Sequence, residues 1–360
     1  MKRKLRISYY AHHMGSGHLR HAQRLAATGL VELQVASTGA SSQRLFEDNV
    51  QYVPLAADEG SSQLRFAPTS GHLHYAPTGK PIVERFTTLN AGWEAFEPDL
   101  VMVDVSVEVA LFARLSGYRV ALRRMPGVRT DRPHRMAYDL ADALFAYYPQ
   151  ALEEPLHRDS YAQKSFYLGT PAPHPSQRSA PQSSDQIPVR DCGDTRRVVV
   201  QTSLAAAVDS SMLVQAAVRS PSWSWEVIGS VHGATDQLPE NLRLHGTVEH
   251  PEQWLDAADV VISSSGHNAV AAAAASKRPT MLIPEERPHA EQAVFARMLH
   301  EAGGCAMLES WDEPVDWEKK LTHVAGTDGS ALARTLLVTQ DEFTAGLQRM
   351  FSSLCDSCPS

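Results

Sequence analysis

Short β-rich runs alternate with segments of helical length along almost the whole chain. In the first half these runs are "LRISYY", "LQVAST", "DLVMVDV" and "RVALRR"; in the second half they are "RRVVVQ", "SWEVIG", "LRLHG", "DVVISSS" and "PTMLIP". Several of the runs are continuously apolar, which is typical of parallel strands covered by helices on both faces. The pattern therefore predicts an α/β fold built from parallel sheets.

A Pro- and Ser-rich stretch without hydrophobic periodicity, residues 169–194, separates the two halves. A chain of 360 residues is long enough for two domains, because domains cluster near ~100–200 residues. We expect one Rossmann-like domain over 1–170, a linker over 171–194, a second Rossmann-like domain over 195–338, and a carboxyl-terminal helix and tail over 339–360 that could pack back on the first domain. Two parallel sheets arranged in this way leave a cleft between their carboxyl ends, where such folds bind ligands.

The composition excludes several classes of protein. A hydrophobic fraction of 43% with 21% charged residues indicates a packed globular fold. The formal charge of -8, without a long basic run, leaves nucleic-acid binding without a source of affinity. No stretch reaches the ~18–20 apolar residues of a membrane span, and "MKRKLRISYYAHH" lacks the apolar region of a signal peptide. We therefore expect a cytoplasmic protein, with peripheral membrane contact left open.

The cysteines give no clear site. Only Cys355 and Cys358 are closely spaced, and a zinc site would need a second pair of ligands that the tail lacks. Reduced surface thiols are the favoured interpretation, and we expect no cofactor.

The segment "AHHMGSGHLRHAQRLA", residues 11–26, predicts a strand, a tight turn and a helix. Gly15 and Gly17 would let a ligand approach the main chain, and the free N–H groups of the helix start would attract an anion. A dinucleotide-binding fingerprint is disfavoured because Arg20 stands where the third glycine belongs. A tight connection without function is an open alternative.

Histidines crowd around this turn. His18 opens the helix and is our first catalytic candidate, as a general base or as a donor to a phosphate or hydroxyl. His12 and His13 point to opposite faces of the strand, so at most one faces the cleft, and His13 is a candidate for acceptor binding. His18 and His21 share a helix face, but no carboxylate partner is evident nearby, so we expect no metal site.

The segment 259–304 predicts strand, turn, helix, strand, loop and helix. Its turn, "SSSG", leads into an alanine-rich helix that begins near His267 or Asn268. The amino end of this helix could hold a diphosphate without a metal ion. A plain capped helix explains the local sequence as well.

Two motifs in this order resemble glycosyltransferase family 28. "SSSGHNAVAAAAASKRPTMLIP" followed by "HAEQAVFARMLHEAGG" resembles the nucleotide-sugar-binding segment of that family, and "GSGHLRHAQRLA" resembles its amino-terminal glycine-rich loop. The family includes the bacterial N-acetylglucosaminyltransferase that completes the lipid-linked peptidoglycan precursor. The resemblance implies the two-domain GT-B fold and a nucleotide-sugar donor.

The resemblance also implies roles for individual residues. It places Ser265 and Gly266 at the donor diphosphate, Glu291 and Gln292 at hydroxyls of the donor sugar, and His18 under the acceptor or the transferred sugar. Helix capping is the local alternative for Glu291 and Gln292. The full set of expected donor-binding residues is Gly15, Gly17, Thr202, Ser203, Ser265, Gly266, His267, Asn268, Glu291 and Gln292.

The chain departs from the family pattern at two places. The family usually has a glutamate that holds the nucleotide ribose in the helix after the "SSSG" turn, whereas the aligned position here is Ala272. The family's glycine-rich loop after the first strand of the second domain is replaced by "VVVQTSLAAAVDSS", in which Thr202 and Ser203 offer hydroxyls.

Two further groups in the first half are candidates. Asp104 ends an apolar strand and is either a second base or a helix cap. Arg129, Asp131 and His134 lie in a basic loop that could bind an anionic acceptor, although a solvated loop with surface ion pairs is the favoured interpretation.

Together these features predict a hexosyl- or N-acetylhexosaminyl-transferase. It would move a sugar from a nucleotide-diphosphate donor, with UDP favoured, to an acceptor hydroxyl without a metal ion. The acceptor could be lipid-linked, a glycan or a small molecule. A nucleotide-sugar hydrolase or epimerase on the same fold, and a non-catalytic nucleotide-sugar-binding protein, are the alternatives.

Overall fold

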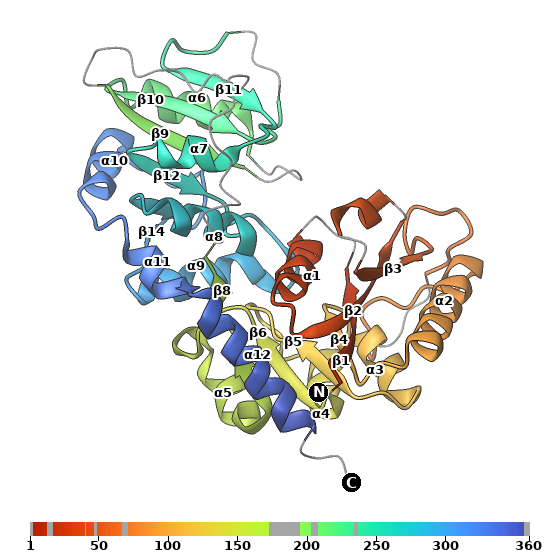
Figure 1. The fold of residues 1–360 in the computed structure, drawn as a ribbon. Helices are drawn as coiled ribbons and strands as arrows, with labels where there is room; N and C mark the ends of the chain where they lie inside the picture. The colour runs from red at the N-terminus through yellow and green to blue at the C-terminus, as the bar shows by residue number, and fades with distance from the viewer. Residues whose placement is uncertain are drawn as a thin grey trace.

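The structure is a computed structural model that describes residues 3–12, 17–39, 41–46, 49–66, 71–172, 195–202, 208–233 and 237–355. Figure 1 shows two lobes, each with a sheet and flanking helices, and a last helix that returns from the second lobe to the first.

The first domain is built on a seven-stranded parallel sheet with the order β3-β2-β1-β4-β5-β6-β7. Its strands are β1 (Leu5–Ala11), β2 (Val31–Thr38), β3 (Val50–Leu55), β4 (Leu100–Asp104), β5 (Val120–Arg123), β6 (Ala143–Ala146) and β7 (Ser165–Tyr167). Its helices are α1 (Gly17–Ala27), α2 (Lys80–Phe96), α3 (Val107–Leu115), α4 (Arg132–Leu140) and α5 (Pro155–Tyr161), with short 3-10 turns at Ser41–Leu45, Gln150–Leu152 and Ala162–Lys164.

The second domain has a six-stranded parallel sheet with the order β11-β10-β9-β12-β13-β14. Its strands are β9 (Arg196–Gln201), β10 (Trp223–Ile228), β11 (Leu242–Gly246), β12 (Val260–Ser263), β13 (Thr280–Leu282) and β14 (Ala306–Met307). Its helices are α6 (Ser210–Val218), α7 (Pro251–Asp256), α8 (His267–Ser276), α9 (Glu291–Glu301), α10 (Trp317–Ala325) and α11 (Ala331–Leu336), with a 3-10 turn at Pro288–Ala290.

The strand orders fix where a ligand can bind. In the first sheet the order reverses between β1 and β4, and in the second it reverses between β9 and β12. Connections on the two sides of a reversal leave the sheet toward opposite faces, which opens a crevice at the carboxyl ends of the strands. Residues that follow β4 and β12, among them Ser106 and Ser264, line the interdomain space.

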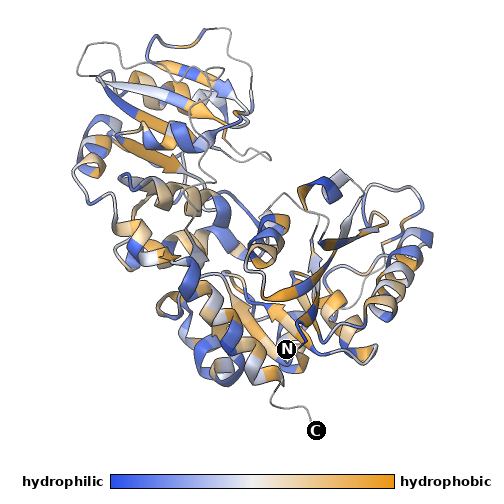
Figure 2. Cartoon of the chain, in the orientation of Figure 1, coloured by the Kyte–Doolittle hydropathy of each residue, from blue (hydrophilic) through white to orange (hydrophobic). Residues whose placement is uncertain are grey.

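The α/β fold class is confirmed, and its physical basis is visible in the burial of the central strands. Every residue of β4 and β12 is buried, as expected for strands covered on both faces. Figure 2 shows apolar residues concentrated on the central strands of the sheets. The sequence pattern missed β3, an edge strand with partly exposed residues and Pro54, and the four-residue β6.

The two domains are joined by a short pair of strands and by the last helix of the chain. After the first domain, β8 (Thr170–Pro171) pairs with β15 (Leu337–Val338), so part of the expected linker is a strand. Helix α12 (Gln340–Cys355) then packs on the first domain, where Phe343, Leu347 and Phe351 share a core with strand β1. The rest of the linker from residue 173 and Cys358 lie outside the described residues. No helix in the described part combines the length and apolar character needed to cross a bilayer.

Candidate active site

An interdomain cleft of about 900 Å³ is lined by residues of both domains, among them His18 and His267. The two domains approach each other closely within this cleft, at Gly17 and Asn268. A Cβ added at Gly17 would lie 2.8 Å from Nδ2 of Asn268, closer than real Cβ contacts allow without a shift. Gly17 begins α1 and Asn268 lies in the first turn of α8, so the starts of these two helices face each other across the cleft.

His18 is paired with Asp104 at the cleft wall of the first domain. Nδ1 of His18 lies 3.0 Å from Oδ1 of Asp104, and Nη1 of Arg123 donates to the same oxygen at 2.7 Å. The hydroxyl of Tyr9 donates to Oδ2 at 2.8 Å. Because a carboxylate only accepts, Nδ1 of His18 carries a proton, and in the neutral ring the lone pair is on Nε2. In this arrangement His18 can act as a general base.

Asp104 is fully buried behind His18. Burial by itself raises the pKa of Asp104, but Arg123 and His18 outweigh it and hold that pKa well below its usual range. The carboxylate is therefore ionised and orients the imidazole. Ser106 caps α3 by accepting from the N–H of Val109, so Asp104 is not the cap. Val105, between them, has φ of 64°, an unusual conformation for a β-branched residue.

The start of α8 has no side-chain cap; Gly266 occupies the N-cap position. Its first N–H groups are thus free of a capping side chain, and the helix dipole adds partial positive charge there. Three buried polar atoms nearby have no hydrogen-bond partner among the described residues: Oγ of Ser265, Nδ1 of His267 and Oδ1 of Asn268. This end of α8 can therefore hold an anionic, hydroxyl-bearing ligand.

Gln292 holds the α8 turn in place. Its Oε1 accepts from the backbone N–H of Ser265 at 3.0 Å and from that of Glu285 at 2.9 Å. The Ser265 amide is therefore occupied by the protein, and the geometry favours a positioning role for the Gln292 carbonyl. Neighbouring Glu291 reaches the other domain, with Oε2 3.0 Å from Nη2 of Arg129. An expected donor residue and an expected acceptor residue thus share one ion pair.

Two other expected donor residues use their polar atoms within the protein. Nε2 of His267 lies 2.9 Å from both the carbonyl oxygen of Tyr147 and Oγ1 of Thr170, in the first domain. Burial, aided by nearby arginines, lowers the pKa of His267 to about 3, so this ring is neutral at pH 7. The hydroxyl of Thr202 donates to the carbonyl of Ser230 at 2.7 Å.

Several expected positions contribute nothing that the structure describes. His13, Gly15 and Ser203 lie outside the described residues. Ala272 packs against the core of the second domain and is not among the cleft-lining residues. His21 is buried and stacks on Tyr147, with ring centroids 4.0 Å apart, at the edge of the cleft.

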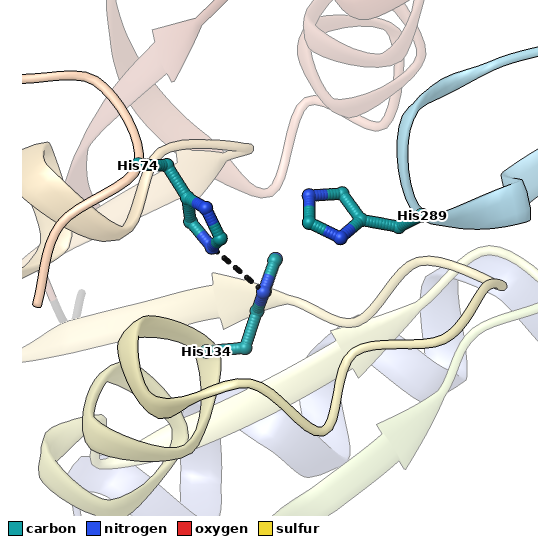
Figure 3. Close-up of side chains that lie close together, drawn as sticks. All are labelled: His74, His134 and His289. Atoms are coloured by element: carbon teal, nitrogen blue, oxygen red, sulfur yellow. Dashed lines mark hydrogen bonds between the residues drawn. The ribbon is translucent and has the colours of Figure 1, made fainter. Parts of the chain in front are cut away.

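Sequence analysis missed two members of one cluster in the cleft, His74 and His289. His74 and His289 join the expected residues Asp131 and His134 (Figure 3). Asp131 caps α4 by accepting from the N–H of His134 at 3.1 Å. Burial, together with Arg129, lowers the pKa of His134 to about 4. The solvated-loop interpretation of this segment is wrong, because Arg129 and His134 are buried in the domain interface.

Comparison with known sequences gives a family match within the second domain. Residues 245–336 match the glycosyltransferase family 28 C-terminal domain. The chain is 32% identical over 127 residues to the UDP-N-acetylglucosamine--N-acetylmuramyl-(pentapeptide) pyrophosphoryl-undecaprenol N-acetylglucosamine transferase of Clavibacter sepedonicus, which is 34% of each protein. It is 36% identical over 67 residues, 19% of this chain, to an uncharacterized glycosyltransferase of Methanosarcina mazei. The second domain is thus similar to the C-terminal domain of glycosyltransferase family 28. These matches span 34% and 18% of the relatives' own lengths.

Solved structures resemble the chain over nearly its whole length. The spinosyn forosaminyltransferase SpnP has a TM-score of 0.68 at 15% identity, covering 97% of this chain and 99% of its own. MurG of Acinetobacter baumannii has a TM-score of 0.60 at 12% identity, covering 96% and 99%. The glycosyltransferase VinC, in complex with DTDP, has a TM-score of 0.63 at 14% identity, covering 98% and 100%. The expected GT-B fold is thereby confirmed.

Proposed function

We propose that this protein is a glycosyltransferase that moves a sugar from a nucleotide-diphosphate donor to an acceptor hydroxyl. One observation carries the proposal: the His18–Asp104 pair and the uncapped start of α8 face the same interdomain cleft. A base on one wall and an anion-binding helix start on the other are the two elements that glycosyl transfer from a diphosphate requires.

In the proposed reaction, Nε2 of His18 takes the proton of the acceptor hydroxyl while the hydroxyl oxygen bonds to the anomeric carbon of the donor sugar. The bond between that carbon and the diphosphate oxygen breaks, and the diphosphate leaves with the electron pair. Asp104 stabilises the imidazolium that forms. The start of α8 stabilises the leaving diphosphate, so this step needs no metal ion.

The names of similar proteins support the donor class. The relative from Clavibacter sepedonicus is named for a UDP-sugar, and VinC was solved with DTDP. We favour UDP because the relative named for a UDP-sugar resembles this chain at 32% identity over 127 residues, whereas VinC resembles it at 14% identity. Ser265, Gly266 and Asn268 would bind the donor at the start of α8.

The first-domain wall of the cleft supports an acceptor with an apolar body. Alongside His18 it presents mainly apolar side chains, namely Leu73, Ile82, Phe86, Leu111 and Phe112. Such a surface suits a lipid-linked or aromatic acceptor with a reacting hydroxyl. A cytoplasmic location stays a prediction from the sequence, and peripheral membrane contact stays open.

The test is an assay of the purified full chain with UDP- and TDP-linked sugars and a panel of apolar acceptors that carry hydroxyls. Mass spectrometry should detect a glycosylated acceptor and free nucleoside diphosphate in equal amounts. Rapid release of free sugar without an acceptor would instead indicate a hydrolase. Tight donor binding without any product would indicate a binding protein.

A further inference from the structure

Three histidines from three distant segments converge in the domain interface. His74 precedes α2, His134 lies in the first turn of α4, and His289 comes from the 3-10 turn of the second domain. One ligand atom from each lies within 4.8 Å of the others, and Figure 3 shows the three rings grouped around a common space. Ring centroids are separated by 4.5 to 5.0 Å.

A carboxylate completes the group. Oxygens of Asp131 lie 3.0 Å from Nε2 of His74, 2.7 Å from Nδ1 of His134 and 3.8 Å from Nδ1 of His289. Ligands about 2.0–2.1 Å from a tetrahedral Zn²⁺ stand roughly 3.3–3.4 Å apart. The three oxygen–nitrogen distances bracket that spacing, whereas the histidine ligand atoms stand up to 4.8 Å apart, so the imidazole rings must approach one another by up to about 1.5 Å to complete a coordination shell.

The protons of this cluster cannot satisfy all of its contacts. Nε2 of His74 and Nδ1 of His134 are 2.9 Å apart, and each also lies against an oxygen of Asp131. If both nitrogens carry protons, two N–H groups face each other; if one does not, its lone pair faces the ionised carboxylate. One repulsive contact persists in every neutral arrangement. A cation between these atoms removes it, because all the lone pairs then point at positive charge.

The backbone directs His289 toward the first domain. The carbonyl of His289 accepts from the N–H of Val128 at 2.7 Å. His289 and Ala290 both have left-handed conformations, with φ of 61° and 51°, which non-glycine residues rarely adopt. Gly127 lies so close that a Cβ there would be 2.7 Å from the same carbonyl. The loop is thus held in an unfavourable conformation that brings the third imidazole to the other two.

We propose that His74, His134, His289 and Asp131 form a site for a divalent transition metal of the Zn²⁺ type that joins the two domains. Imidazole nitrogens with one carboxylate oxygen are a ligand set that suits Zn²⁺. The proposal departs from the expectation, drawn from the sequence, that the chain has no metal site. It does not rest on the proposed glycosyl transfer, because the metal clamps the interface and takes no part in the chemistry at the diphosphate.

Arg129 is the group that opposes metal binding. Its Nη1 lies 3.0 Å from Nε2 of His134, and its Nη2 pairs with Glu291. When Nδ1 of His134 binds a metal, the ring proton moves to Nε2, so Arg129 must turn away from the ring. After this turn, the Arg129 guanidinium can keep its ion pair with Glu291.

The test uses the full chain, freed of metal with a chelator and then titrated with Zn²⁺ by calorimetry and with Co²⁺ by visible absorption. We expect one ion per chain and the intense visible bands of tetrahedral Co²⁺. His74→Ala and His289→Ala should each weaken binding at least tenfold and abolish those bands. Asp131→Asn, which retains a capping oxygen for α4, should weaken binding as well.

The matched control is His323→Ala, which removes an exposed histidine of α10 far from the cluster in the sequence. It should bind Zn²⁺ as the unmodified chain does, and melting curves of the metal-free variants should show that each is folded. Zn²⁺ should raise the melting temperature of the unmodified chain and of His323→Ala but not of His289→Ala. The proposal is overturned if the unmodified chain takes up no stoichiometric metal, or if His74→Ala and His289→Ala bind as tightly as the control.

Discussion

At the level of single residues, hydrogen bonds and charge pairing explain how the Asp104 carboxylate can be completely buried behind His18. One oxygen of Asp104 accepts from Arg123 and His18, and the other accepts from Tyr9. A buried charge is tolerated when it is paired and hydrogen-bonded in this way. The same contacts fix the tautomer of His18 and leave Nε2 at the cleft.

Replacing His18 by alanine should separate binding from chemistry. His18→Ala removes the base but leaves the start of α8 untouched, so donor affinity should stay the same while kcat falls by about 10²–10⁴-fold. Calorimetry with the donor and a transfer assay measure the two quantities. Unchanged transfer rates would contradict the assignment of His18.

Asp104→Asn should lower both stability and activity. The substitution leaves the buried Arg123 guanidinium without its counter-charge, and breaking a buried pair in this way costs about 3–5 kcal/mol. Urea unfolding followed by circular dichroism measures the loss. Adding Arg123→Met should recover part of the stability but not the transfer rate, because His18 then still lacks its carboxylate.

At the level of elements, the candidate site lies at strand-to-helix turns. The helices around it are held in place by buried side chains. Helix α5 shows the second arrangement: His157 is its one buried residue and packs edge-on against Tyr138, with centroids 5.3 Å apart. Burial, with Arg124 nearby, lowers the pKa of His157 to about 3. The short helix is thus held by a neutral imidazole.

This burial makes stability depend on pH. Between pH 6.5 and about 3 the unfolded chain protonates His157 and the folded chain does not, so the contribution is complete above pH 6.5 and is lost progressively below it. From pH 7 to pH 5 the unmodified chain should lose about 2 kcal/mol more than His157→Gln. Urea unfolding of both proteins at the two pH values tests this, and equal losses would contradict it.

At the level of the whole molecule, contacts between distant segments hold the two domains around the cleft. Strand β8 pairs with β15, His267 reaches Tyr147, and Glu291 pairs with Arg129. Helix α12 then covers the first sheet from the far end of the chain. The first domain therefore depends on residues that follow the second domain in the sequence.

Phe343→Ala tests this dependence. Phe343 is fully buried in the core that contains β1, so its truncation should destabilise the first domain by about 3–5 kcal/mol. Hydrogen exchange read out separately for each domain should show faster exchange in the first sheet and little change in the second. Phe66→Ala, at a phenylalanine with 65% exposure, is the matched control and should have almost no effect.

The sequence by itself determined the fold class and the positions at which helices α1 and α8 begin. Continuous apolar runs specify parallel strands because both faces of such a sheet are buried, and this depends only on local sequence. The glycine at position 17 and the "SSSG" turn mark helix starts for a similar reason, since backbone conformation and capping are local properties.

Only the tertiary structure decided which side chains meet. Asp104 lies beside His18 because β1 and β4 are neighbours in the sheet, although 86 residues separate the two in the sequence. His289 of the second domain meets His74 and His134 of the first only when the domains dock. No spacing in the sequence predicts this cluster. Contacts of this kind depend on the strand order and on the way the two domains pack together. Both are set by many weak packing interactions between distant segments, so no single segment of the sequence specifies them.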